Sequence, residues 1–341
     1  MTSEQKQQIN QLLGSSKNIL ILTHHNPDGD AIGSSLALYN YLLIKGYNAQ
    51  IIVPNDFPAF LSWMPGQEKI LAYTHHKEEA DEFIDKADII FCLDFNAIVR
   101  LEKLGEQVSK NKAVRIMIDH HPQPVCDFDF AFSDVNASST SELIYDFIEG
   151  LGDGEMINKA IAECIYVGMM TDTGSFSYSC NSEHTYLIIA KLFKLGIDGQ
   201  NIHRLVYDTY SEYRLRLLGY SLSEKFIVKA EYHTAYIYLT RAELLRFNYK
   251  IGDTEGLVNY ALSIRGINLA VLFVEKEGAI RLSIRSKGDF SVNDFARKHF
   301  NGGGHRNAAG GDSYLPMDET IQFFESLLPA YKDALGSSSV E

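Results

Sequence analysis

The stretch Ile-Leu-Ile-Leu-Thr-His-His-Asn-Pro-Asp-Gly-Asp, residues 19–30, carries the signal from which both fold and site are predicted. Its first four residues form a short aliphatic run with polar residues after it, which is typical of a buried strand. Asn26-Pro27 predicts a turn, and apolar residues recur at helical spacing from Ile32 onward. The side chains between strand and helix that can bind a metal ion are His24, Asp28 and Asp30.

Three further aliphatic runs, at residues 50–53, 87–93 and 113–118, predict three more strands in the N-terminal half. Helical patterns separate several of these runs. Strands that alternate with helices indicate a parallel sheet with right-handed crossovers. The sequence therefore predicts an α/β fold for this half, with residues 55–82 less regular.

The pattern changes after the fourth strand. Mostly helices are expected from about residue 138 to 223, followed near Lys229 by β-like segments at 234–239, 268–274 and 279–284. A last helix starts at about Asp318. We therefore predict a larger domain over residues 1–225 and a smaller α+β domain over residues 230–341.

Composition limits the function. The chain has 341 residues, 45% of them hydrophobic and 22% charged, which indicates a folded protein. Its net charge of −13 argues against sequence-independent binding to long DNA or RNA, because such binding depends on neutralising phosphates. A small anionic ligand at one local cationic site is still compatible with this charge.

The same sequence predicts a cytoplasmic protein that is not bound to a membrane. No apolar run approaches the roughly 20 residues that span a bilayer, and the polar N-terminus does not have the pattern of a signal peptide. The four cysteines are scattered, without a Cys-x-x-Cys pair, and we expect reduced thiols that serve packing. They are Cys92, Cys126, Cys164 and Cys180.

Four segments each place Asp or His directly after a buried element, and three of these elements are strands of the predicted parallel sheet. Their side chains can therefore meet at one sheet edge, where ligands bind in such folds. Carboxylates with imidazoles suit Mn²⁺, Mg²⁺ or a similar ion, and the absence of cysteine from these four segments argues against structural zinc. These segments contain enough Asp and His side chains to bind two ions about 3.5–4 Å apart. Its residues are His24, Asp28, Asp30, Asp94, Asp119, His120, His121 and Asp172.

Each part alone has an ordinary alternative. Asp28 or Asp30 could cap the helix, Asp94 could cap the next one, and Asp172 could belong to a turn. His120-His121 could be a hydrogen-bonded loop pair. Taken together these alternatives are weak, because carboxylates packed at one edge repel one another unless a cation lies among them.

A second group of residues lies near the C-terminus. Residues 301–311, Asn-Gly-Gly-Gly-His-Arg-Asn-Ala-Ala-Gly-Gly, allow backbone N–H groups to approach an anion, with Ala308-Ala309 expected at a closely packed helix start. Upstream, strand alternation puts Arg281, Ser283 and Arg285 on one face, where a guanidinium could bind a phosphate. Without its neighbours, a glycine run would more often be a flexible loop.

These motifs resemble the DHH phosphoesterase family. His24-x-x-x-Asp28-x-Asp30, Asp94, Asp119-His120-His121 and Asp172 are similar in type and order to its four metal-binding motifs. Arg285-Ser286 with Gly302-Gly303-Gly304-His305-x-x-Ala308-Ala309-Gly310 resembles its DHHA1 substrate-binding domain. In its length, the chain is similar to the nanoRNase/pAp phosphatase group. Enzymes of this group degrade very short RNA and remove the 3′-phosphate of 3′-phosphoadenosine 5′-phosphate (pAp). One departure is Asn301, where that group commonly has glycine.

The resemblance implies a role for each matching residue. His24 and Asp28 would bind one ion, Asp30, His120 and Asp172 the other, and Asp94 would bridge them. Asp94, His120 and His121 would be catalytic, with His121 facing the phosphate. The active site would lie in the cleft between the domains. The residues expected to bind substrate are His121, Arg285, Ser286, Gly303, Gly304 and His305.

The expected reaction is hydrolysis of phosphate esters by a water that two divalent ions activate, with Mn²⁺ favoured over Mg²⁺ or Co²⁺. The expected substrates are short RNA oligonucleotides and pAp-like nucleotides, and a homodimer stays open. One alternative is a phosphodiesterase for linear dinucleotides such as pApA. Another, from a different class, is a catalytically silent nucleotide sensor.

Overall fold

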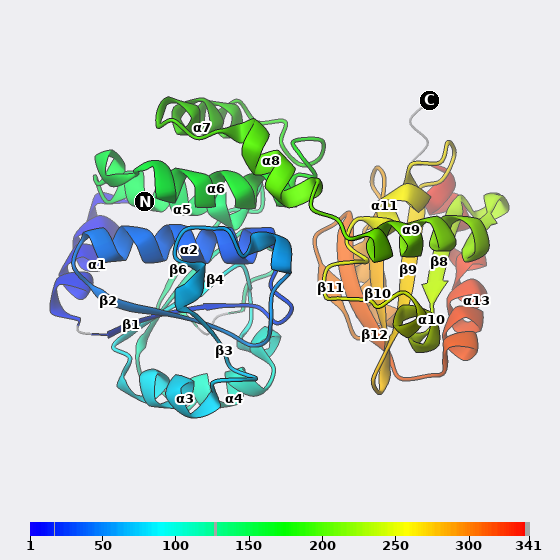
Figure 1. Cartoon of the computed structure of the whole chain (residues 1–341), viewed down its shortest axis with the longest axis horizontal. Coiled ribbons are helices and arrows are strands. Elements are labelled where there is room, and N and C mark those ends of the chain that lie inside the picture. Colours follow the sequence, from blue (N-terminus) through cyan, green and yellow to red (C-terminus); the bar gives the residue numbers. More distant parts are fainter. Residues whose placement is uncertain (17, 126–127, 338–341) are drawn as a thin grey trace. The chain divides into compact units, whose positions relative to one another are not determined.

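Two six-stranded sheets organise the chain, one in each of its two units (Figure 1). The computed structural model describes residues 1–16, 18–125 and 128–337. The first unit covers Met1–Thr209 and the second Tyr210–Glu341. The predicted fold class, a parallel-sheet α/β domain followed by a smaller α+β domain, is confirmed.

The sheet of the first unit is parallel throughout, with strand order β3-β2-β1-β4-β5-β6. Its central strands β1, β4 and β5 are neighbours, as the site prediction requires. The strands are β1 (Asn18–Thr23), β2 (Asn48–Val53), β3 (Ile70–Ala72), β4 (Ile89–Leu93), β5 (Val114–Asp119) and β6 (Phe130–Ser133).

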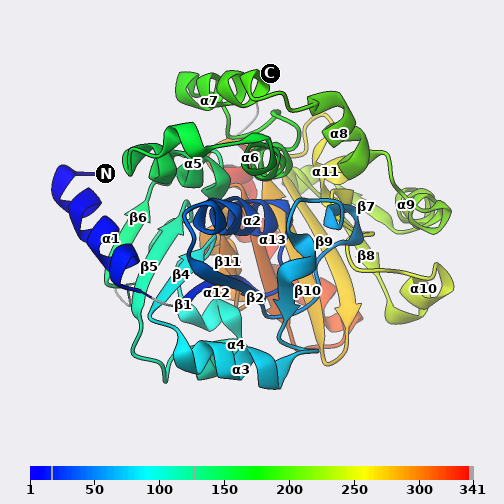
Figure 2. The same cartoon turned by 60° about the vertical axis from the view of Figure 1, so that its left-hand side comes forward.

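Helices cover both faces of this sheet, with α2, α5 and α6 on one face and α3 and α4 on the other (Figures 1 and 2). Ile21 of β1 packs in the core cluster of the first face and Leu22 in that of the second. Burial on both faces explains why the strands are continuous apolar runs. The helices are α1 (Ser3–Ser15), α2 (Gly29–Ile44), α3 (Lys77–Lys86), α4 (Lys103–Val108), α5 (Thr140–Gly150), α6 (Lys159–Asp172), α7 (Glu183–Lys194) and α8 (Gly199–Tyr207).

Residues 55–82 are more regular than the sequence suggests, because they contain β3 and the start of α3. β3 has only three residues, and α3 buries only Ala80 and Ile84 among charged side chains, so neither gives a strong pattern. Residues 138–223 are mostly helical, as expected, but the last part of this region is not one continuous helix. The chain forms α8 and then α9 (Glu212–Glu224), which begins where Ser211 Oγ accepts the N–H of Arg214.

α9 lies with the second unit, whereas the sequence predicts the first domain through residue 225. The reason is its apolar face: Leu217 packs in one core cluster with Ile237 of β8 and Leu257 of α11. The helix therefore belongs to the core of the second unit.

The second sheet has strand order β11-β12-β10-β9-β8-β7 and is antiparallel except for the β8–β9 pair. Its strands are β7 (Phe226–Lys229), β8 (Thr234–Leu239), β9 (Leu269–Lys276), β10 (Ala279–Ser286), β11 (Gly303–Gly304) and β12 (Ala308–Ser313). The remaining helices are α10 (Arg241–Arg246), α11 (Leu257–Leu262), α12 (Val292–His299) and α13 (Met317–Gly336).

α12 and α13 cover one face of this sheet, where Phe295 and Phe324 pack with Phe273 and Ile284. The helix start expected at Ala308-Ala309 is wrong, because these residues open β12. The glycines before them let β11 lie very close to β12: a Cβ atom on Gly302 would lie 2.0 Å from the carbonyl oxygen of Gly310. The glycine run is thus required by strand pairing.

Cys92, Cys164 and Cys180 are buried free thiols, and burial raises the pKa of Cys92 to about 12. Cys126 lies outside the described residues. Among the helices that the structure describes, none combines the length and the apolar character needed to cross a bilayer.

Candidate active site

The metal-binding candidates of the first unit come from the carboxyl ends of β1, β4 and β5 and from the end of α6. Asp94 directly follows β4 and has a left-handed backbone conformation, with φ of 63°. This conformation is uncommon for a residue with a side chain, and such residues occur often at functional sites. His120 directly follows β5, and Asp172 is the last residue of α6.

The first group of converging side chains consists of His24, Asp28 and Asp94, whose candidate ligand atoms lie within 4.8 Å of one another. Nε2 of His24 lies 3.3 Å from Oδ2 of Asp94. Nδ1–H of His24 donates to the carbonyl of His25 at 2.9 Å. Because this bond uses Nδ1, Nε2 is the nitrogen presented to a metal ion, an arrangement common among metal-binding histidines.

The second group consists of Asp30, His120 and Asp172 within the same distance limit. Nε2 of His120 lies 3.8 Å from Asp30 and 3.5 Å from Asp172. Nδ1–H of His120 donates to the carbonyl of Ala137 at 3.2 Å. His24 and His120 are therefore oriented in the same way: Nδ1 donates to a backbone carbonyl, and Nε2 points towards carboxylates.

Asp94 lies between the two groups. Its Oδ2 faces His24, and its Oδ1 lies 3.6 Å from Nε2 of His120. Thr140 Oγ1–H donates to the same Oδ1 at 3.0 Å. One carboxylate thus reaches both groups, as a bridging ligand must.

The charges of these groups fit divalent cations. Burial, together with the charges of Asp30 and Asp28, raises the pKa of Asp94 well above its usual range. Although burial opposes it, the surrounding carboxylates raise the pKa of His120 to about 9. Without a metal ion, the cluster therefore takes up protons to limit repulsion. A cation would relieve the same repulsion, and oxygen with imidazole donors suits Mn²⁺ or Mg²⁺.

The start of α5 holds Asp30 in place. The backbone N–H groups of Thr140 and Ser141 donate to its two carboxylate oxygens at 2.6 and 2.9 Å. A helix N-terminus favours negative charge, so these bonds orient the carboxylate and favour its ionised form, although burial raises the pKa of Asp30 overall. Ser139, directly before Thr140 and Ser141, is the residue that caps α5.

Asp28 combines two of the roles considered for it. Its Oδ1 accepts the N–H groups of Asp30 and Ala31 and so caps α2, while the same carboxyl group belongs to the His24 group. The capping interpretation and the ligand interpretation are therefore compatible.

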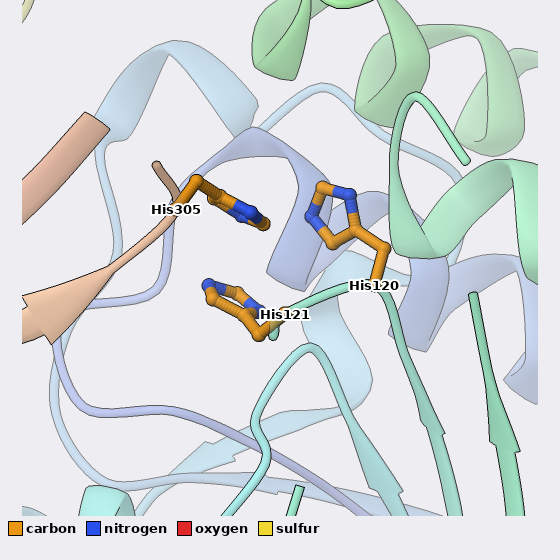
Figure 3. A group of neighbouring side chains, drawn as sticks. All are labelled: His120, His121 and His305. Atoms are coloured by element: carbon orange, nitrogen blue, oxygen red, sulfur yellow. The ribbon is translucent and has the colours of Figure 1, made fainter. Parts of the chain in front are cut away.

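His121 lies beside His120, with ring centroids 5.2 Å apart and nearly perpendicular planes (Figure 3). Its Nδ1 lies 2.7 Å from Oδ1 of Asp119, and both side chains are buried. Burial and the charges of His120, Arg100 and His24 hold the pKa of His121 well below its usual range. Arg100 is not among the residues predicted from the sequence; its carbonyl accepts the N–H of His25 at 2.9 Å, which places it beside the end of β1.

The substrate-binding candidates of the second unit occupy two places. Arg285 lies on the partly exposed face of β10, whereas the buried Ser286 points to the other face and donates to the carbonyl of Phe290. Gly303 and Gly304 form β11, and the N–H of Gly304 donates to Asn293. His305 begins the tight turn that joins β11 to β12. The predicted site in a cleft between the domains stays a prediction.

Comparison with known proteins agrees with the resemblance seen in the motifs. The N-terminal domain of the DHH family matches residues 18–169, and the DHHA1 domain matches residues 231–331. The bifunctional oligoribonuclease and PAP phosphatase NrnA of Bacillus subtilis is 30% identical, over 87% of this chain and 89% of its own length. This chain belongs to the DHH phosphoesterase family.

Two further proteins match nearly the full length of this chain. The bifunctional oligoribonuclease and PAP phosphatase NrnA of Thermus thermophilus is 29% identical over 93% of this chain and 90% of its own length. The crystal structure of an exopolyphosphatase-related protein from Bacteroides fragilis is 44% identical, covers 98% of both chains and has a TM-score of 0.92.

Proposed function

We propose that this chain is a metal-dependent hydrolase that cleaves short oligoribonucleotides and removes the 3′-phosphate of pAp. The observation that carries this proposal is the position of Asp94, whose two carboxylate oxygens face His24 on one side and His120 on the other. The names of the Bacillus and Thermus relatives, each an oligoribonuclease and PAP phosphatase, supply the substrate class.

Two divalent ions are proposed as the cofactor, with Mn²⁺ first and Mg²⁺ or Co²⁺ as alternatives. His24 and Asp28 would hold one ion, Asp30, His120 and Asp172 the other, with Asp94 shared. The chemistry that such ions supply is activation of a water and neutralisation of charge on the phosphoryl oxygens.

The protein's own part is to hold these ligands and the substrate in place. The backbone bonds at Nδ1 orient both metal-facing histidines, and the start of α5 orients Asp30. Asp119 accepts the Nδ1 proton of His121 and so orients the ring. Nε2 would face the substrate phosphate and would donate to a phosphate oxygen once it has taken up a proton, which the negative charge of the phosphate favours. Pre-oriented groups of this kind lower the barrier, because no reorganisation is needed during reaction.

The DHHA1 domain is proposed to bind the substrate. Arg285 would hold a phosphate through its guanidinium, which suits a bidentate phosphate contact. Ser286, Gly303, Gly304 and His305 are proposed to complete this site. A cytoplasmic location and a homodimer stay predictions from the sequence.

A side-by-side assay tests the proposal. Hydrolysis of pAp, pApA, a pentaribonucleotide and pyrophosphate is measured with Mn²⁺ and with EDTA. We expect metal-dependent release of phosphate from pAp and of mononucleotides from the pentamer. Preference for pApA alone would favour the dinucleotide phosphodiesterase, and best activity on pyrophosphate would overturn the substrate class. Binding of pAp without any hydrolysis would favour the nucleotide sensor.

A further inference from the structure

One face of β10 carries two arginines and a serine. Arg281, Ser283 and Arg285 alternate with Leu282 and Ile284, which are buried against the opposite helices. The three polar residues are exposed or partly exposed. Two guanidinium groups therefore lie on one side of a strand in a chain whose net charge is −13.

The neighbouring strands make this face open on one side only. Arg281 and Ser283 pair on β9 with Val274 and Leu272, which are buried in the cluster that includes Leu257 of α11. On β12, by contrast, the residues directly opposite are small or polar. They are Ala308 beside Arg285, Gly310 beside Ser283 and Asp312 beside Arg281. We call the three residues of β10 and these three residues of β12 together the arginine face.

Arg281 is held in a defined position on the arginine face. Its Nη1 donates to Oδ2 of Asp312 at 2.8 Å, directly across from it on β12. Its Nη2 lies over Gly310, 3.6 Å from the place that a Cβ atom would take there. The side chain is still 44% exposed, and a guanidinium has five N–H donors, so one ion pair leaves donors for a second anion.

We propose that Arg281 is a second phosphate-binding residue, used by oligoribonucleotides and not by pAp. This proposal rests on the proposed function, in which Arg285 binds a substrate phosphate. Charge complementarity supports it, because the arginine face has two positive groups and one negative group. Gly310 and Ala308 leave the sheet surface low enough for a sugar–phosphate backbone to lie against it.

Spacing explains why the two substrates would differ. Residues 281 and 285 lie four strand positions apart, which is about 13 Å along β10. Stacked nucleotides rise by about 3.4 Å each, so this distance corresponds to about four stacked nucleotides, and to fewer in an extended chain. The two phosphates of pAp lie on one ribose. A pAp molecule held at Arg285 would therefore not reach Arg281, which Asp312 holds towards β12.

The test compares Arg281→Gln with Arg265→Gln, an exposed arginine of the same unit that lies outside the arginine face. For the full-length enzyme with Mn²⁺, KM is measured for pAp and for a pentaribonucleotide. We expect Arg281→Gln to raise KM for the pentamer about five- to tenfold and to change KM for pAp less than about twofold, since only the pentamer loses a charge-assisted contact. Arg265→Gln should leave both values unchanged.

A binding measurement separates this proposal from the proposed function. Pentaribonucleotide binding to the metal-free proteins is followed by calorimetry at several salt concentrations. Arg281→Gln should weaken binding and lower the slope of log K against log salt by up to about 0.7, the value for one phosphate contact of a single strand. If the wild type binds the pentamer and Arg281→Gln weakens that binding, but the wild type hydrolyses none of the substrates, the proposed function is wrong while the role of Arg281 in phosphate binding is supported. Equal effects of Arg281→Gln on pAp and pentamer, or none on the pentamer, would overturn the proposal.

Discussion

Nδ1 of His121 donates a 2.7 Å hydrogen bond to Oδ1 of Asp119, and both side chains are buried at the carboxyl end of β5. The other oxygen, Oδ2, has no hydrogen-bond partner within the described part of the chain. A buried carboxylate used mainly to orient an imidazole is a costly feature. Its position next to the metal-facing groups indicates a role in holding His121.

Replacing Asp119 should therefore reduce turnover. In Asp119→Asn the amide can turn its N–H towards Nδ1 and stabilise the wrong tautomer of His121. We expect kcat to fall about 10- to 100-fold, the range for loss of such an orienting partner, with little change in KM for pAp. Imidazole ¹⁵N shifts of His121 report the tautomer directly.

The protein contains a matched control for this pair. Asp146 accepts from His184 at 2.9 Å on the surface of the first unit. Asp146→Asn changes the same kind of bond away from the proposed active site, and it should leave kcat within about twofold. An equal loss in both variants would show that the effect of Asp119→Asn is not specific.

Metal binding should become tighter as the pH rises towards 9. The pKa of His120 is raised to about 9 in the metal-free protein, so a metal ion must displace a proton from it at neutral pH. Calorimetric titration with Mn²⁺ in buffers of different ionisation enthalpy should show proton release at pH 7 and much less at pH 9.5. Absence of proton release at pH 7 would contradict the assignment of His120 as a ligand.

The same shift has a consequence for stability. A histidine whose pKa is higher in the folded than in the unfolded protein stabilises the fold fully below about pH 6.5, and this contribution is lost as the pH rises through about 9. The metal-free protein should thus become less stable over this interval, whereas the loss should be smaller with Mn²⁺ present. Thermal unfolding at pH 6, 7.5 and 9 measures both.

Arg285 should matter for substrate and not for metal. Arg285→Gln removes the guanidinium proposed to bind a phosphate, and we expect KM for pAp to rise about tenfold, the loss of one charge-assisted contact. The affinity for Mn²⁺ should stay constant, because all proposed metal ligands lie in the first unit. A fall in Mn²⁺ affinity at constant KM would contradict the division of roles between the domains.

In the second unit, Glu243 is predicted to stabilise the fold at neutral pH. Although burial opposes it, Lys225, Tyr220 and Thr240 lower the pKa of Glu243 to about 2. The stabilisation is present above about pH 4.5 and is lost as the pH falls through about 2. Glu243→Gln should cost about 1–2 kcal/mol at pH 7, after allowance for solvent screening, and much less at pH 2. Urea unfolding checks this, with the exposed Glu319→Gln as a control.

The sequence predicts the parts of the molecule in which a buried apolar strand leads directly into a residue of the candidate site. The run 19–22 predicted β1 because a strand buried on both faces is apolar at every position, and Asp94 was found because it directly follows such a strand. The motifs also predicted the family. Local sequence patterns gave the wrong secondary structure where packing between strands determines it. Ala308-Ala309 opens β12 because Gly302 and Gly304 let β11 approach this strand closely, and local residue preferences do not indicate that approach.

Other site features depend on long-range contacts. Thr140 and Ser141 hold Asp30 from a position 110 residues away in the chain, and their own sequence predicts only a helix start. Arg100 acts on His24 and His121 through its charge, from a short 3-10 helix that shows no ligand pattern. Such residues are identified from the folded structure and not from spacing.

If Asp94 joins two groups of metal ligands into one hydrolytic centre, its loss should affect both metal binding and hydrolysis. The most direct measurement is phosphate release from pAp as a function of Mn²⁺ concentration for wild type, Asp94→Ala and the exposed control Asp208→Ala, with thermal unfolding of each protein with and without Mn²⁺. We expect Asp94→Ala to stay folded but to lose at least about 100-fold in rate and most of the stabilisation by Mn²⁺, while Asp208→Ala behaves as wild type. Wild-type rates and wild-type stabilisation by Mn²⁺ in Asp94→Ala would contradict the bridging role of Asp94.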